Sequence, residues 1–162
     1  MDLLFSKYDL TLVLENQHKQ LREHINKLAE DYVLSVSESD LAAHLIDKYS
    51  IEPITLGEPF IASSGEVNID VSHDPMRGGY GLGRPIIVKG MQVHIKVPFT
   101  GDGQLFWCQP SSFTLSPPRA VVTDEYLEFY IKGDRLVGDN VKRSLESALA
   151  EINGYLRNIR TA

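Results

Sequence analysis

Hydrophobic residues in the first part of the chain recur at steps of three and four positions. They are Leu10, Val13, Leu14, Leu21, Ile25 and Leu28, and His18 falls on the same stripe. Residues three and four apart share one face of a helix, so this spacing predicts a long amphipathic helix over residues 9 to about 30. The intervening positions are strongly polar, which predicts that the other face of this helix lies in water.

A second, shorter helix is predicted between Ser37 and Tyr49. Its apolar positions are Leu41, Leu45 and Ile46. The Ser37 hydroxyl can accept hydrogen bonds from the free amides of the first turn, and the acidic Asp40 in that turn suits the helix dipole. Pro53 closes the segment, because a proline disfavours helical backbone at the residue before it.

From Ile54 onward the period of the pattern changes to two. Val67, Ile69 and Val71 alternate with polar residues, as do Val93, Ile95, Val97 and Phe99. Shorter strand candidates lie at residues 105–108, 113–115, 120–122 and 127–131, and the last two flank a turn at 123–125. Because no helix pattern separates these candidates, they predict a largely antiparallel sheet linked by hairpins. The linker-like stretches are residues 57–66 and 73–84.

The last segment has the clearest helical pattern. Its apolar face is formed by Val137, Val141, Leu145, Ala148, Leu149, Ile152, Leu156 and Ile159. The expected fold class is therefore α+β, a mainly antiparallel sheet packed with long amphipathic helices at the N- and C-terminal ends. We predict one domain over residues 1–162, helical in 1–52, strand-rich in 53–132 and helical in 133–162.

Composition limits the class of protein. The chain has 162 residues, 43% of them hydrophobic, which suffices for one core. Its longest apolar runs are far shorter than a membrane helix needs, and the first residues lack the pattern of a signal peptide. The single Cys108 fits a reducing compartment. We expect a soluble, cytoplasmic protein without membrane contact.

Charge is distributed unevenly along the chain. Residues 1–74 hold five Lys or Arg against fourteen Asp or Glu. Residues 75–122 hold Arg77, Arg84, Lys89, Lys96 and Arg119 against the single Asp102. Two interpretations stay open: the basic segment packs near acidic helices of the same chain, or it forms a site for an anionic ligand.

Residues 73–84 are the segment in which a site is most expected. They contain four glycines together with Arg77 and Arg84, and the arginines offer planar donors to phosphate or carboxylate groups. The glycine spacing matches neither a Rossmann fingerprint nor a P-loop. Either a mobile loop without a ligand or a contact with an anion or partner, which His73 and Tyr80 could join, is consistent with this composition.

The sequence contains no recognisable catalytic constellation or metal site. There is no Gly-x-Ser-x-Gly elbow, and Cys108 within a Phe-Trp-Cys run is typical of a buried small hydrophobe. His18 and His24 are six residues apart and lie on poorly aligned helix faces. His73 and Asp74 could share a proton, but capping of the turn before Pro75 explains Asp74 more simply. We therefore expect no catalytic residue, metal or cofactor, and an enzyme is not the favoured class.

Three strings carry a resemblance to a known family. They are Asp70-Val-Ser-His-Asp-Pro-Met-Arg77, Val93-His-Ile-Lys-Val-Pro-Phe-Thr-Gly-Asp102 and Gln109-Pro-Ser-Ser-Phe-Thr-Leu-Ser-Pro-Pro-Arg119. With their helical flanks they resemble the amino-terminal domain of a family of uncharacterised bacterial proteins, whose longer members continue into a restriction-endonuclease-like, PD-(D/E)xK, nuclease domain. The resemblance covers most of residues 20–160, and the chain departs from the pattern at residues 78–83.

This resemblance implies a non-catalytic binding, sensing or assembly module. Such a module could associate with itself or with another protein through its helix faces, as the regulatory partner of a nuclease in bacterial antiviral defence. The alternative is binding of nucleic acid or a nucleotide by the basic 75–122 zone. There, Arg77, Arg84, Lys89, Lys96 and Arg119 would neutralise phosphates, and Tyr80, Phe106 or Trp107 would stack on bases.

Overall fold

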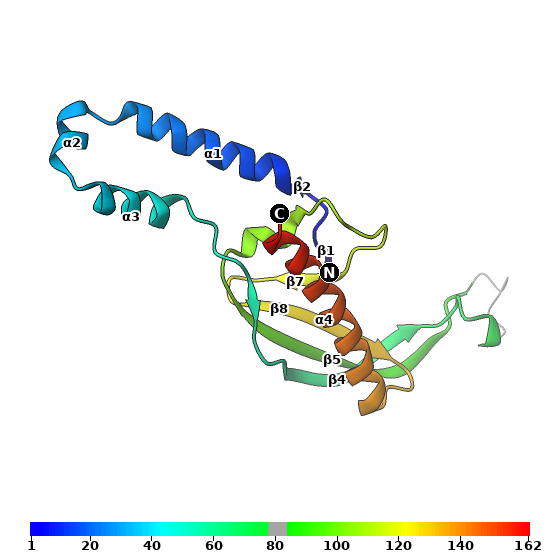
Figure 1. Cartoon of the computed structure of the whole chain (residues 1–162). Coiled ribbons are helices and arrows are strands. Elements are labelled where there is room, and N and C mark those ends of the chain that lie inside the picture. The colour runs from blue at the N-terminus through cyan, green and yellow to red at the C-terminus, as the bar shows by residue number, and fades with distance from the viewer. Residues whose placement is uncertain (78–83) are drawn as a thin grey trace. The chain divides into compact units, whose positions relative to one another are not determined.

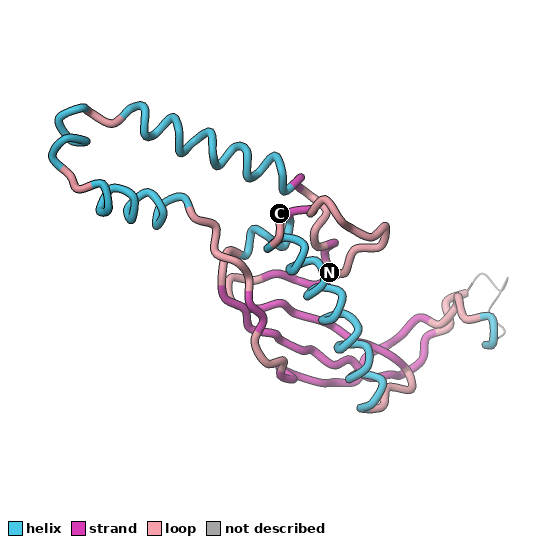
Figure 2. Tube along the Cα trace, in the orientation of Figure 1, coloured by secondary structure: helices cyan, strands magenta, loops and turns pink. Residues whose placement is uncertain are grey.

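A computed structural model describes residues 1–77 and 84–162 of the chain (Figures 1 and 2). The fold is α+β with a curled antiparallel sheet, as the sequence predicts. Its internal contacts divide the chain into two compact units. The sheet unit consists of Met1–Asp2, Leu56–Phe99 and Arg119–Asn153, and the helical unit consists of Leu3–Thr55, Thr100–Pro118 and Gly154–Ala162.

The sheet unit is built around four strands. They are β4 (Phe60–Asp70), β5 (Ile87–Thr100), β7 (Arg119–Val122) and β8 (Tyr126–Gly133), and the short strands β1 (Asp2–Leu3) and β3 (Thr55–Leu56) belong to the same sheet. Antiparallel pairing runs from β7 through β8 and β5 to β4. A 3₁₀ turn, η1 (Pro75–Arg77), follows β4. The hairpin of β7 and β8 around the predicted turn at 123–125 is confirmed.

Alternation along β5 places two kinds of side chain on opposite faces of the sheet. Val93, Ile95 and Val97 point toward α4 (Gly138–Arg160), whereas His94 and Lys96 point to the other face. Their partners on β8 continue each face, because residues directly opposite one another share a side. The cross-strand pairs are Ile95 with Phe129, Val97 with Leu127, His94 with Tyr130 and Lys96 with Glu128. The apolar pairs form the core of this unit.

The prediction of a linker over residues 57–66 is wrong, since β4 begins at Phe60. Its first half is held to β5 by register pairs such as Ser64 with Val93. Most of these side chains are exposed, and a β-bulge between Ile61 and Ser63 interrupts the alternation. A strand held mainly by backbone hydrogen bonds has no hydrophobic pattern in its sequence, which explains why the first half of β4 was not predicted.

The helical unit begins with three helices. They are α1 (Leu10–Lys27), α2 (Glu30–Ser35) and α3 (Glu38–Tyr49), and α1 and α3 lie side by side (Figure 2). Asp9 caps α1 by accepting from the Thr11 amide at 2.8 Å, and Ser37 caps α3 as predicted, accepting from the Asp40 amide at 3.1 Å. The predicted helix to residue 30 therefore ends at Lys27, and a separate short helix follows.

A cluster of aromatic rings forms the core of the helical unit. Phe5 stacks on Tyr155 with ring centroids 4.6 Å apart and meets Phe106 at 6.1 Å. Phe5 is only 1% exposed and holds a left-handed backbone with φ of 51°, a conformation that costs free energy for a residue other than glycine. Its burial among these rings offsets that cost.

Two of the short strand predictions are wrong. Residues 103–107 form a 3₁₀ helix, η2 (Gly103–Trp107), and only β6 (Cys108–Gln109), which pairs in parallel with β2 (Tyr8–Asp9), is extended. Asp102 starts η2 by accepting from the Gln104 amide at 3.0 Å. Residues 113–115 form no strand, and the Tyr155 hydroxyl accepts from the Thr114 amide at 2.9 Å. Short apolar runs cannot separate these alternatives by periodicity.

The predicted C-terminal helix is confirmed as α4. Among the described residues, no helix combines the length and apolar character needed to cross a bilayer.

Candidate binding surfaces

A groove in the sheet unit runs between the first turns of α4 and the strands β4 and β5. This sheet groove has a volume of about 420 Å³. Its described lining is formed by Pro59, Phe60, Ile61, Ser64, Met91, Val93, Ile95, Leu136, Val137, Gly138, Val141, Lys142 and Leu145. Ten of these thirteen side chains are apolar, so the groove suits an apolar occupant.

The sheet groove has a rigid floor and an exposed mouth. Ile95 at the floor is 2% exposed and belongs to the core. Ile61, Met91 and Val137 at the mouth are 66%, 42% and 57% exposed. Lys142 is the one charged side chain among the described lining residues, and its ammonium lies 3.8 Å from the Glu146 carboxylate.

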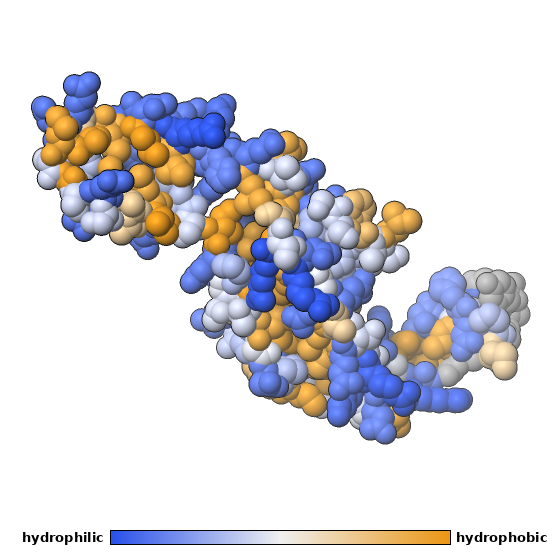
Figure 3. All heavy atoms as spheres, in the orientation of Figure 1, coloured by the Kyte–Doolittle hydropathy of each residue, from blue (hydrophilic) through white to orange (hydrophobic). Residues whose placement is uncertain are grey.

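A second groove lies in the helical unit, between α1 and α3. This helical groove has a volume of about 350 Å³. It is lined by His18, Leu21, Ile25, Ala42, Leu45, Ile46, Tyr49 and Ser50. Figure 3 shows hydrophobic side chains gathered over α1 and α3 in its upper left part. No carboxylate, lysine or arginine belongs to this lining, all of which is described.

The helical groove is exposed because two helices can cover only one stripe of each other. Leu21 and Leu45, on the facing stripes, are half-buried, whereas Ile25 and Ile46 beside them are 44% and 66% exposed. Polar contacts fix the two helices against each other. The Gln17 amide donates to the Tyr49 carbonyl at 3.0 Å, and the Tyr49 hydroxyl bonds His24 Nδ1 at 2.8 Å. The apolar surface is therefore held in a defined shape.

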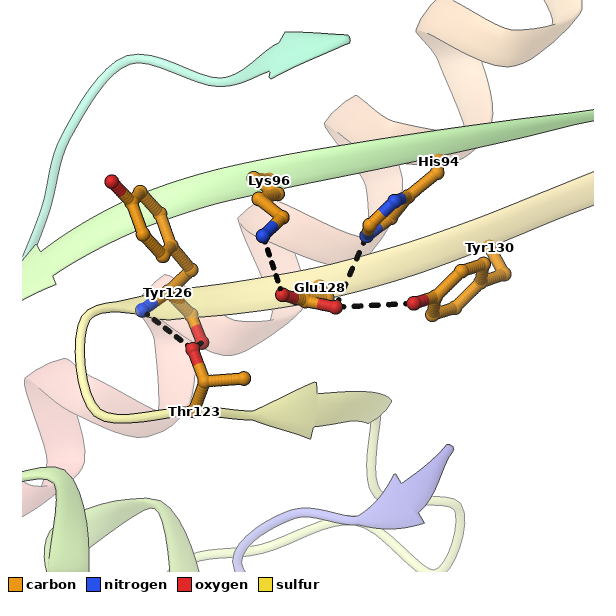
Figure 4. Close-up of polar contacts among 6 residues, drawn as sticks. All are labelled: His94, Lys96, Thr123, Tyr126, Glu128 and Tyr130. Carbon is orange, nitrogen blue, oxygen red and sulfur yellow. Dashed lines mark hydrogen bonds and ion pairs between the residues drawn. The ribbon is translucent and has the colours of Figure 1, made fainter. Parts of the chain in front are cut away.

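A polar cluster occupies the sheet face opposite α4 (Figure 4). Its centre is the Glu128 carboxylate, which is 8% exposed. Lys96 Nζ lies 3.0 Å from one carboxylate oxygen, and His94 Nε2 and the Tyr130 hydroxyl lie 3.1 Å from the other. The His94 and Tyr130 rings stack with centroids 4.4 Å apart. Three donors from two neighbouring strands therefore converge on one anion.

These contacts shift the pKa values of Glu128, Lys96 and Tyr130. The hydrogen bond from Lys96 lowers the pKa of Glu128, with further lowering by Tyr130 and His94 and an opposing effect of burial. The same bond to Glu128 raises the pKa of Lys96. Burial, and then the bond to Glu128, raises the pKa of Tyr130. Because Lys96 and His94 on β5 both bond Glu128 on β8, the cluster acts as a clamp between the two strands.

Two of the predicted anion-binding residues take part in ion pairs within the sheet unit. Lys89 Nζ lies 2.8 Å from the Glu66 carboxylate, and Lys96 pairs with Glu128. Each pair reduces the positive field that a phosphate would meet. The predicted basic zone is therefore weaker than its residue count indicates.

The other predicted site residues are exposed or lie outside the described part. Arg84 and Arg119 are exposed, as is His73. The side chain of Arg77 and the whole of Tyr80 lie outside the described residues.

The structural interpretations of Asp74 and Cys108 are confirmed. Asp74 accepts from the Met76 amide at 2.9 Å, which caps the turn at Pro75. Cys108 is 3% exposed, and burial raises the pKa of its thiol, followed by a smaller effect of Asp102. A thiol in this state is a poor nucleophile.

Glu128 and its three partners did not emerge from sequence reasoning. They lie up to 36 positions apart, between His94 and Tyr130, and meet only because the β5–β8 register aligns them. The available signal was the polar set of the alternation in each strand, which contains all four residues.

Comparison of the chain with family models, with curated proteins and with solved structures gave no significant match. The resemblance to the nuclease-associated family therefore stays a prediction.

Proposed function

We propose that the protein is a non-catalytic assembly module that pairs with a second copy of itself through the helical groove. The observation that carries this proposal is the exposure of Ile25 and Ile46 at the groove. Apolar patches of this kind mark association surfaces, because contact removes their area from water.

The distribution of charge favours a second copy as the occupant. Residues 10–49 hold seven acidic and four basic residues. None of these charged side chains lines the helical groove, although all of this stretch is described. Two copies can therefore bring this surface together without burying like charges. A twofold contact uses the same patch on both chains and is the commonest form of homo-oligomer.

The expected association is limited in strength. Full burial of an isoleucine contributes about 1.5 to 3 kcal/mol, and Ile25 and Ile46 are already partly covered. Four such side chains in a twofold contact must also offset the lost freedom of two molecules. We therefore expect a weak association, with a dissociation constant on the order of 100 μM.

Sedimentation equilibrium of the full chain tests this proposal. The wild type should form a dimer, and Ile46→Lys should be a monomer because each copy would bury an unpaired ammonium. His44→Lys is the matched control, since it adds the same charge to an exposed position on α3 outside the groove. A monomeric wild type at high micromolar concentration, or equal behaviour of the two variants, contradicts the proposal.

The sequence resemblance adds a regulatory role to this assembly. It implies that the module regulates a nuclease domain in bacterial defence. The test is therefore co-elution of this chain with a nuclease domain of the PD-(D/E)xK type. Co-elution that depends on Ile46 would support this role. Unchanged elution of both proteins would leave the dimer standing and remove the nuclease from the proposal.

A further inference from the structure

The sheet groove contains a cation that is free to change partners. Among the described residues, Lys142 forms an ion pair with Glu146 at 3.8 Å, and their side chains are 74% and 61% exposed. An exposed pair four residues apart on a helix contributes little, because water screens both charges. The Lys142 ammonium can therefore turn toward another anion at small cost.

The rest of the sheet groove has the size and lining of a small-molecule site. Its volume of about 420 Å³ falls within the roughly 300 to 1,000 Å³ that is typical of ligand pockets. Ile95 anchors the floor in the core, whereas Ile61 and Met91 at the mouth are exposed and can adjust to a flexible chain. An apolar body of modest width fits this arrangement.

From these two features we infer that the sheet groove binds a single-chain amphiphile with an anionic head, of the class of fatty carboxylates. The alkyl chain lies along Val93, Ile95 and Leu145, and the carboxylate pairs with Lys142. A neutral head gains no ion pair, and a cationic head meets a like charge. The sheet and helical grooves share no residue, so this inference is independent of self-association.

Two other occupants are conceivable and are separated by the experiment. Within the described residues β4 pairs with β5 alone, so an extended peptide could add to its free edge through backbone hydrogen bonds. A second copy could cover the apolar mouth. Neither occupant requires a carboxylate at Lys142. A dependence of affinity on the head group of the amphiphile therefore distinguishes the proposed ligand from these two occupants.

Isothermal titration calorimetry of the full chain is the test, with dodecanoate, dodecanol and dodecyltrimethylammonium, each below its critical micelle concentration. Dodecanoate should bind saturably with one-to-one stoichiometry. A single exposed ion pair should make it bind roughly two- to five-fold more tightly than dodecanol. Dodecyltrimethylammonium should bind most weakly.

Three variants locate the site. Lys142→Gln should remove the preference for dodecanoate while dodecanol still binds. Lys132→Gln is the matched control, because Lys132 is an exposed cation of the same unit outside the groove. Met91→Glu places a carboxylate at the exposed mouth and should weaken binding of dodecanoate and dodecanol alike. Circular dichroism checks that each variant is folded.

Several outcomes would overturn the inference. They are absence of saturable dodecanoate binding, equal affinity for the three amphiphiles, and a Lys142→Gln variant that still prefers dodecanoate. Displacement of dodecanoate by a capped peptide of alternating valine and threonine, binding more tightly, would assign the groove to strand addition. A fall from dimer to monomer in Met91→Glu would assign it to a second copy.

Discussion

The helical groove and the sheet groove are both apolar, but they are built from different parts. Two helix stripes form the first, whose lining contains no Asp, Glu, Lys or Arg, while a helix and two strands form the second, with Lys142 at its side. Apolar area supplies free energy of binding without direction, whereas a charge discriminates between ligands. Two surfaces of similar size on one chain therefore call for different occupants.

The largest expected effects come from one substitution in each groove, because each should change only the binding property assigned to its own groove. Ile46→Lys removes the apolar contact of a side chain that is 66% exposed in each copy, so self-association should weaken by about 2 to 4 kcal/mol, while dodecanoate binding should be unchanged. Met91→Glu should weaken dodecanoate binding and leave self-association unchanged. Sedimentation and calorimetry on the same two proteins measure both quantities. Loss of self-association in Met91→Glu would assign the sheet groove to a second copy, and loss of dodecanoate binding in Ile46→Lys would contradict the independence of the two grooves.

A smaller effect is expected at the polar cluster, which lies in the sheet unit on the face opposite the sheet groove. Glu128→Ala leaves Tyr130 and His94 without their acceptor and should lower the free energy of unfolding by about 1 to 3 kcal/mol. Glu125→Ala, at an exposed turn position, should change it by less than about 0.5 kcal/mol. Urea denaturation measures both. Equal losses would show that the clamp contributes nothing to stability.

The same cluster predicts a dependence of stability on pH. The folded state lowers the pKa of Glu128, so its contribution is present above the unfolded value of about 4.3 and is lost as pH falls through the folded value. Lys96 has a raised pKa, so its contribution is present below about 10.4 and is lost at higher pH. The free energy of unfolding, measured by urea denaturation at a series of pH values, should therefore fall less steeply at acid pH in Glu128→Gln than in the wild type. An equally steep fall in both proteins argues against the lowered pKa.

The smallest effect distinguishes the grooves by salt. Dodecanoate binding to the sheet groove should weaken between low and high ionic strength by less than about five-fold, because one exposed ion pair is screened. Self-association through the apolar helical groove should be nearly constant or strengthen as salt is added. Calorimetry and sedimentation at matched salt concentrations measure these trends. A strong salt dependence of the dimer would indicate charged contacts there.

The longer helices α1, α3 and α4 could be predicted because their apolar positions follow one period, whereas the short α2 was not predicted. Ser37 even gave the N-terminal boundary of α3, since its hydroxyl accepts from the Asp40 amide. The first half of β4 could not, because Ser63 and Ser64 are held by backbone pairing and leave no hydrophobic pattern. A strand can be recognised from alternating apolar residues only where one of its faces is buried.

The candidate surfaces were predicted less well than the fold. An uncovered helix face was expected, and Ile25 and Ile46 lie on one. The sheet groove was missed, because it joins Met91 to Lys142 across 51 positions of sequence. The basic zone was overvalued, since Lys89 and Lys96 pair with carboxylates from neighbouring strands. A count of charged residues along the sequence does not show which of them form ion pairs, because strand register determines which side chains meet.

The distance between two copies tests the central claim most directly. A spin label at His44→Cys lies on α3 outside the helical groove, and the only native thiol, Cys108, is buried. Pulsed dipolar spectroscopy of this singly labelled chain should give a defined distance between copies, which Ile46→Lys abolishes. A signal without dipolar modulation, or one that Ile46→Lys leaves intact, would contradict pairing through the helical groove.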